Sequence, residues 1–137
     1  MESKQVRIIT PMYVIIPRKR TKDKRIPINM NAYGNVNSFT NNEVKKMFKS
    51  IVESQILNTK IATPVEITYQ IYKPSRRRLD KMNVIAVTSK YLLDAITELG
   101  CWEDDNDDYV KTETLLPTIY DKNKGRVEIN IISLNND

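Results

Sequence analysis

The sequence predicts an α+β fold, with a small mixed sheet of about four to five strands and two main helices in the order β-loop-α-β-α-β-β. Residues 65–72 alternate an inward set, Val65, Ile67, Tyr69 and Ile71, with more polar side chains, which is the period of a half-buried strand. Residues 44–56 instead space their apolar side chains three and four apart, which predicts an amphipathic helix. A length of 137 residues with 40% hydrophobic content suits a single domain over residues 1–137.

The first half of the chain divides into strands, a loop and a helix. Residues 5–16 are rich in β-branched types and predict one or two strands. Residues 18–38 combine basic side chains with turn-forming and asparagine-rich sequence, which predicts a long, mobile basic loop. A helix is expected from Asn41 or Asn42, as the N-cap, to about Asn58. Its apolar stripe consists of Val44, Met47, Phe48, Ile51, Val52 and Ile56.

A second helix is expected from about Asp80 to Leu99, after the strand at 65–72. Its inward positions would be Ile85, Leu92, Ile96 and Leu99. Gly100 follows at the C′ position, where a left-handed conformation costs glycine least.

The last part of the chain predicts two strands. These are residues 109–116 and 127–134, joined by a turn around residues 123–125. They complete the predicted order of elements.

Composition excludes several classes of chemistry. The chain has no histidine and one cysteine, so it offers no histidine-based triad, no HNH-type nuclease site, no Cys/His zinc site and no internal disulfide. Its three glycines form no phosphate-binding loop, and a nucleotide cofactor is therefore not expected. The absence of a secretory or membrane-length apolar segment predicts a cytoplasmic protein that does not enter a membrane. Any catalysis must therefore use carboxylates, lysines, hydroxyls and a bound ion.

The distribution of charge is more informative than its total of +5. Six of the eight residues in 18–25 are basic, and a second basic cluster at 76–78 follows Lys73. Residues 103–108, here called the acidic loop, contain five carboxylates in six positions. The rest of the chain therefore carries a formal charge of +10. This combination indicates a protein that binds a polyanion and holds a cation.

Three aspartates flank the second predicted helix. Asp80 precedes it, and Asp104 and Asp105 follow its end. The strand that begins at Tyr109 is expected to fold the acidic loop back toward Asp80. Carboxylates of this kind are ligands for Mg²⁺, which activates water and neutralises charge in phosphodiester cleavage. Neighbouring arginines would hold the phosphates through their planar forks.

The segment 76–105 resembles the RusA family of Holliday junction resolvases. The resemblance rests on RRRLDKMN at 76–83, KYLLDAI at 90–96 and GCWEDD at 100–105, in that order. It implies a RusA-like fold and a homodimeric, phage- or prophage-type endodeoxyribonuclease. Such an enzyme uses Mg²⁺, with Mn²⁺ as a possible substitute, to cut four-way junctions and other branched DNA. It also implies catalytic roles for Asp80, Asp104, Asp105 and Lys90, with the three aspartates as metal ligands.

One departure from the family pattern bears on activity. Met82 occupies the position of a second acid, so one carboxylate is missing. Asp94 is the candidate to replace it as a metal ligand. The alternative function is a catalytically weak or inactive DNA-junction binding protein. The residues expected to contact DNA phosphates are Lys73, Arg76, Arg77, Arg78, Lys81, Arg18, Lys19 and Arg20.

Each candidate also has an ordinary structural interpretation. The acidic loop would be a solvated connection or a surface for protein contacts, and Asp80 a helix N-cap, a role compatible with binding metal. Lys90 and Asp94 would form a surface ion pair at i, i+4. A calcium loop is excluded, because Tyr109 and Leu115 stand where glycine and glutamate are required. The aromatic residues that would either pack or stack on unpaired bases are Tyr33, Phe39 and Trp102.

Overall fold

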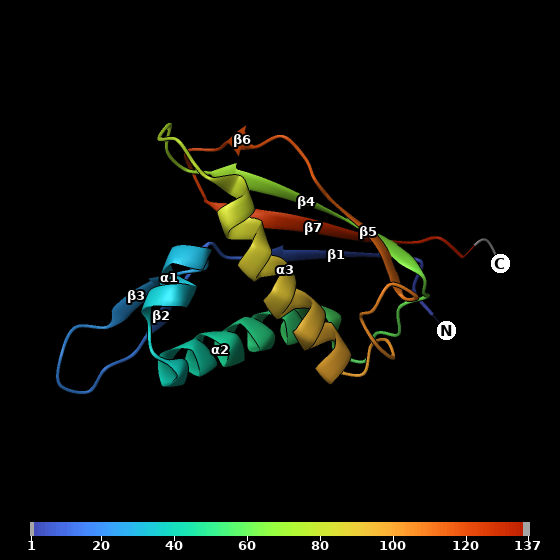
Figure 1. Cartoon of the computed structure of the whole chain (residues 1–137), viewed down its shortest axis with the longest axis horizontal. Coiled ribbons are helices and arrows are strands. Elements are labelled where there is room, and N and C mark those ends of the chain that lie inside the picture. Colours follow the sequence, from blue (N-terminus) through green and yellow to red (C-terminus); the bar gives the residue numbers. More distant parts are fainter. Residues whose placement is uncertain (1, 136–137) are drawn as a thin grey trace.

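A five-stranded mixed sheet carries its helices on one face (Figure 1). The computed structural model describes residues 2–135. The strand order is β1 (Gln5–Thr10), β7 (Arg126–Ser133), β4 (Val65–Lys73) and β5 (Val110–Leu115), and β6 (Ile119–Tyr120) also pairs with β4. Strands β2 (Tyr13–Ile16) and β3 (Lys24–Pro27) form a separate two-stranded sheet. The helices are α1 (Met30–Asn35), α2 (Ser38–Ile56) and α3 (Lys81–Glu98). The α+β prediction is confirmed, with α2 and α3 as the two main helices.

Strand β4, helix α3 and strand β5 form a parallel crossover. Val65 pairs with Val110 and Tyr69 with Leu115, so β4 and β5 run in the same direction. Helix α3 must therefore return along the sheet from the end of β4 to the start of β5. This places residues that follow β4 and residues that follow α3 at opposite ends of the sheet.

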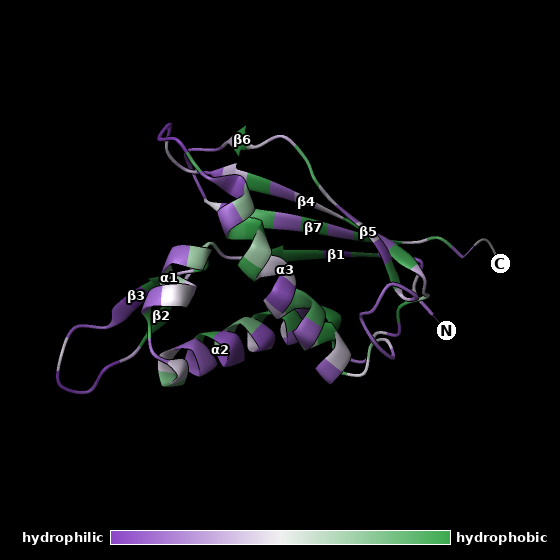
Figure 2. Ribbon diagram, in the orientation of Figure 1, coloured by the Kyte–Doolittle hydropathy of each residue, from purple (hydrophilic) through white to green (hydrophobic). Residues whose placement is uncertain are grey.

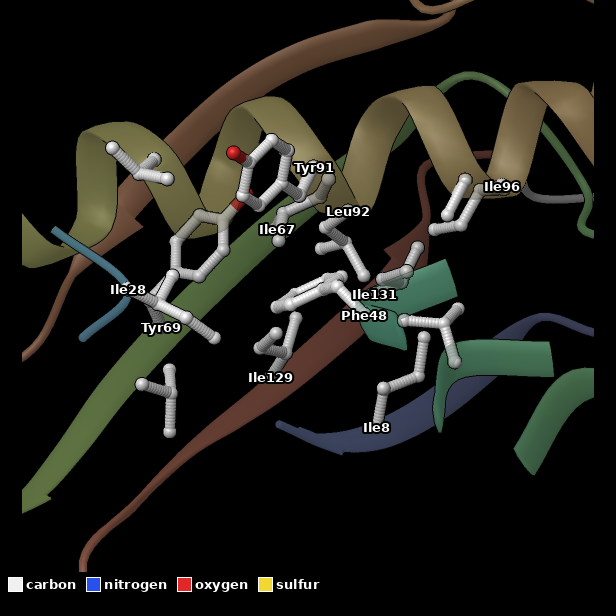
Figure 3. Packing of buried hydrophobic residues seen from close by; sticks show 14 of the residues in the cluster. Ile8, Ile28, Phe48, Ile67, Tyr69, Tyr91, Leu92, Ile96, Ile129 and Ile131 are labelled. Atoms are coloured by element: carbon white, nitrogen blue, oxygen red, sulfur yellow. The ribbon is translucent and has the colours of Figure 1, made fainter. Parts of the chain in front are cut away.

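The core lies between the sheet and the two long helices (Figure 3). Ile67 of β4, Ile129 of β7 and Phe48 of α2 are completely buried. The rings of Phe48 and Tyr91 lie 5.7 Å apart in a tilted arrangement. Fully burying each such side chain stabilises the fold by roughly 1.5–3 kcal/mol. The core therefore fixes α3 against the sheet along its length.

Helix α3 matches its prediction closely. The Asp80 side chain caps it by accepting a hydrogen bond from the Asn83 amide at 3.3 Å. Gly100 follows its C-terminal end with a φ of 74°, in the left-handed region. Of the predicted inward positions, Ile85, Leu92 and Ile96 are buried and Leu99 is half-buried.

Helix α2 begins earlier than predicted. Its N-cap is Asn37, whose side chain accepts a hydrogen bond from the Thr40 amide at 2.8 Å. Asn41 and Asn42 lie inside the first turns. The start was misplaced because several asparagines precede the apolar stripe, and the local pattern does not say which of them caps.

The predicted mobile loop at 18–38 is largely ordered structure, and that prediction is wrong. Strand β3 pairs with β2 in an antiparallel hairpin, and Ile26 and Ile28 are 3% and 1% exposed. Asn29 then caps α1 by accepting a hydrogen bond from the Ala32 amide. Two of the asparagines that suggested a loop, Asn29 and Asn37, are helix caps. The irregular connection is residues 17–23, which Figure 2 shows as hydrophilic.

The two C-terminal strands form but do not pair with each other. Strand β4 lies between them, pairing in parallel with β5 and antiparallel with β7. The chain passes through β6 at the far end of β4 and turns at residues 121–125 into β7. Within the described residues, no helix is both long enough and apolar enough to cross a membrane.

Candidate nucleic-acid interface and carboxylate cluster

Three cationic segments gather where β4 ends and α3 begins, a region we call the basic end (Figure 1). They are the β2–β3 hairpin, the loop 74–80 and the turn 121–126. One cavity is lined by residues from all three, including Arg25, Leu79 and Arg126. Since these segments are far apart in sequence, the sheet topology alone brings their charges together.

The arginine loop at the basic end is exposed and partly organised. Arg76, Arg77 and Arg78 are all exposed, as is Lys81 in the first turn of α3. The Arg76 guanidinium lies 4.4 Å from the centre of the Tyr120 ring. Lys73, in contrast, donates a hydrogen bond to the Arg77 carbonyl at 3.0 Å and so closes the loop. The arginines therefore project from a loop that a lysine holds in shape.

The N-terminal basic cluster lies in the connection between β2 and β3, which projects away from the arginine loop (Figure 1). Lys19 and Arg20 are exposed in the connection at 17–23. Arg18 is half-buried and pairs with Glu43 of α2 at 3.4 Å. Arg18 thus anchors this connection, and the other two cations remain available to phosphate.

The turn into β7 adds cations that the sequence analysis missed. Arg126 bonds to Asp121 at 2.9 Å and Glu128 at 2.8 Å, and its guanidinium lies 3.9 Å from the centre of the Tyr72 ring. These contacts fix the turn that exposes Lys122 and Lys124. The missed signal was three cations at alternate positions from 122 to 126, around Gly125.

The acidic loop lies at the opposite end of α3 and is organised by its own side chains. Asp104 accepts hydrogen bonds from the Asp105 amide at 2.7 Å and from the Asn106 side chain at 2.9 Å. Asn106 in turn accepts one from the Asp108 amide at 2.9 Å. Such local bonds are characteristic of turns rich in Asp and Asn. Both carboxylate oxygens of Asp104 are thereby engaged within the loop.

Asp105 faces two other carboxylates. Burial raises its pKa, and the charges of Asp104 and Asp94 raise it further. Asp94 is on the last turns of α3 and forms an ion pair with Lys45 of α2 at 3.3 Å. Asp105 is thus repelled by two neighbouring carboxylates, and Lys45 of α2 partly compensates the charge of Asp94.

Lys90 is exposed on α3 one turn before Asp94. Asp94 pairs with Lys45, and Lys49 and Lys45 both pair with Glu98. The i, i+4 ion pair between Lys90 and Asp94 does not form. Within residues 2–135, Lys90 has neither an ion-pair nor a hydrogen-bond partner.

The predicted metal ligands do not converge within one chain. Helix α3 has 18 residues and is about 27 Å long at 1.5 Å per residue. Asp80 caps its start, and Asp104 and Asp105 follow its end. The expected return of the acidic loop toward Asp80 is wrong, because β5 starts beside the start of β4. Among residues 2–135, no three acidic or cysteine side chains form a group that could hold a metal ion.

The aromatic candidates divide between packing and exposure. Trp102 is 6% exposed, and its indole donates to the Thr97 hydroxyl at 2.7 Å, so it packs in the fold. Tyr33 is half-buried against Tyr91, with ring centres 6.2 Å apart. Phe39 is 71% exposed at the start of α2. Only Phe39 among these three is free to stack on a base.

Comparison with known proteins adds no assignment: no family model matches the chain, and a search of curated proteins finds no match.

Proposed function

We propose that this protein is a metal-dependent, structure-specific endonuclease that acts on Holliday junctions and other branched DNA as a homodimer. The observation that carries the proposal is the separation of charge along α3. Exposed cations from three segments gather at its start, and Asp94, Asp104 and Asp105 gather at its end. A polyanion binds the first region, and the second attracts a cation. The resemblance of residues 76–105 to the RusA pattern supports the same activity.

The length of α3 decides how such a site is built. Because Asp80 and Asp105 are separated by the helix, one chain does not bring them to one ion. A twofold dimer solves this if Asp80 and the arginines of one protomer meet the acidic loop of its partner. Twofold symmetry then generates two equivalent sites, which suits the two opposed strands of a four-way junction.

The residues have separate roles in this arrangement. Arg76, Arg77 and Arg78 grip phosphates through their planar forks, and the unpaired ammonium of Lys90 stabilises negative charge on the reacting phosphate. Asp80 and Asp105 would hold Mg²⁺, or Mn²⁺ in its place. The ion, when bound, supplies water activation and charge neutralisation.

A junction-binding protein without catalysis is the second candidate. Two observations favour it: the acids are divided between the ends of α3, and Met82 is 62% exposed where the RusA pattern has an acid. This function needs the basic end and no metal. It predicts the same DNA affinity with no cleavage.

One assay separates the two candidates. The protein is incubated with a synthetic four-way junction or with linear duplex of the same sequence, in Mg²⁺, Mn²⁺ or chelator. Paired, symmetric cuts in the junction alone, dependent on the metal, support the endonuclease. Junction binding without cuts in either metal supports the second candidate.

The shared site is tested with a heterodimer of Asp80→Asn and Asp105→Asn chains, purified through two different tags. Each variant homodimer is expected to be inactive. The heterodimer retains one complete site, so we expect it to nick the junction at about half the wild-type rate. An inactive heterodimer, alongside an active wild type, would show that each site is built within one chain.

A further inference from the structure

The basic end contains a cavity of about 750 Å³ that the proposed cleavage does not use. It lies between the β1–β2 corner, the start of α3 and the turn into β7. This volume is in the range of pockets that bind small molecules and cofactors. Its lining is largely apolar, with Met12, Ile28, Ile51 and Val84 among the side chains. The cavity therefore fits a compact apolar body and not a bare ion.

One polar group buried in the wall of the cavity has no partner. Thr10 ends β1 and lines the cavity with 1% of its surface exposed, and its hydroxyl has no hydrogen-bond partner in the described chain. Asn29, which also lines the cavity, uses its side-chain oxygen to cap α1. A buried hydroxyl without a partner is uncommon, because its desolvation costs about 1–3 kcal/mol. The Thr10 hydroxyl is thus closed off from the cavity by its neighbours, so recognition of a ligand falls to the apolar lining and the charged rim.

The rim of the cavity carries the exposed cations Arg25 and Lys124 on a rigid support. Arg25 lies 3.8 Å from the centre of the Tyr13 ring, and Arg126 is fixed by Asp121 and Glu128. At Gly125 a Cβ atom would lie 2.8 Å from Pro74 Cδ, so the turn packs directly on the arginine loop. The anion-binding rim and the apolar interior are therefore parts of one built structure.

We propose that this cavity binds the base of an unpaired nucleotide, while Arg25 and Lys124 hold the adjacent phosphates. A base combines a flat apolar body with polar edges, and its phosphate matches the rim. Inorganic phosphate would leave the apolar lining unused, and an uncharged apolar ligand would leave the cations unused. The assignment of this nucleotide to DNA rests on the proposed function, since bases at a branch point leave the stack at low cost.

The test uses 2-aminopurine, a fluorescent base, placed at the branch point of a four-way junction or within one arm. Binding is measured in chelator, so that cleavage plays no part. We expect the branch-point probe to respond on binding and the arm probe to remain unchanged. Equal responses from the two positions, or none from the branch point despite junction binding, would overturn the proposal.

Two variants test the cavity itself. Lys124→Ala removes a cation of the rim and should weaken capture of the branch-point base about fivefold, whereas Lys111→Ala, on exposed β5, should leave it unchanged. Met12→Trp fills the cavity and should weaken capture at least about tenfold. Thermal unfolding identifies any variant that fails to fold. Wild-type capture by folded Lys124→Ala and Met12→Trp would contradict the assignment.

Free nucleotide provides the second arm. Deoxyadenosine monophosphate should perturb the backbone NMR signals of Thr10, Met12 and Gly125, whereas deoxyribose phosphate, which lacks the base, should not. Equal effects of the two compounds would refute the proposal that the cavity binds a base. A strong response to the free nucleotide with none to the junction would overturn DNA as its source. Because neither arm needs metal or cleavage, base capture without cleavage refutes only the endonuclease, and cleavage without base capture refutes only the cavity.

Discussion

The two ends of α3 show two ways of concentrating charge. The acidic end draws its carboxylates from Asp94 and the loop at 103–108, within 15 residues of one another. The basic end combines the β2–β3 hairpin, the loop 74–80 and the turn 121–126, which are up to about 100 positions apart. Charged residues that are close together in the sequence stay close together in the folded protein, whichever strands pair. A cluster assembled from distant segments exists only after the sheet has formed.

The two ends also differ in what holds them. The acidic loop relies on short-range hydrogen bonds that the side chains of Asp104 and Asn106 accept from backbone amides. The basic end relies on cation–ring contacts and on the ion pairs of Arg126. Disturbing one end should therefore leave the other intact, which makes the two ends separable by mutation.

The largest expected effect separates cleavage from binding. Asp105→Asn should lower the rate of junction cleavage by more than about 100-fold while leaving junction affinity intact or tighter. The reason is that one ligand charge is lost and no phosphate contact is touched. Asp107→Asn, an exposed acid of the same loop, is the control and should cut normally. Wild-type turnover by Asp105→Asn would refute the role of the acidic end.

The next effect concerns the stability of the basic end. Burial raises the pKa of Glu128, but hydrogen bonds from Arg126 and Arg7 lower it more, so the net shift is downward. Glu128→Gln should reduce the free energy of unfolding by about 1–2 kcal/mol at pH 7, less than a fully buried pair because Arg7 is exposed.

The direction of the Glu128 pKa shift also predicts how this stabilisation changes with pH. Since the folded pKa lies below the unfolded one, the stabilisation is complete above the ordinary glutamate pKa and is lost as pH falls through the folded value. Urea unfolding should therefore show a gap between wild type and Glu128→Gln that closes on acidification. Glu66→Gln, on the same open sheet face, is the control. A gap that stays constant with pH would contradict the ion-pair explanation.

A smaller effect tests phosphate contact at the basic end. Arg77→Ala should weaken binding to junction and duplex alike by about fivefold and reduce the salt slope by about one. Lys111→Ala removes the same charge from exposed β5 and should change neither quantity. The affinities of both variants and of the wild type, measured over a series of salt concentrations, test these two expectations. Loss of junction affinity alone would indicate shape recognition by Arg77.

The smallest effect concerns the metal-free acidic end. The pKa of Asp105 is raised first by burial and then by Asp104 and Asp94, so ionisation of Asp105 costs the folded state stability as pH rises through that pKa. In chelator at pH 7, Asp105→Asn should therefore unfold roughly 1–2 °C above wild type, with no difference at low pH. Added Mg²⁺ should raise the unfolding temperature of wild type and not of the variant. A less stable variant in chelator would disprove the repulsion.

Elements with strong local signals were predictable. Helix α3 is marked by its apolar stripe, its Asp80 cap and its Gly100 terminator, and all three are as expected. The structure of residues 18–38 was not predictable, because β3 has only four residues and forms through its pairing with β2. Asparagine is common both in loops and at helix N-caps, so Asn29 and Asn37 did not distinguish a loop from the start of a helix.

The sequence by itself determined the kinds of residue available: no histidine, a basic body, one acidic loop and a helix that joins Asp80 to it. Only the tertiary structure decided where these lie relative to one another. A helix between parallel strands must run back along the sheet, so it carries its two flanking segments to opposite ends. That reversal separates Asp80 from Asp105 and gathers cations of three distant segments around the cavity that contains Thr10. The periodicity of the sequence predicts neither the separation of the aspartates nor the gathering of the cations, because both depend on which strands pair.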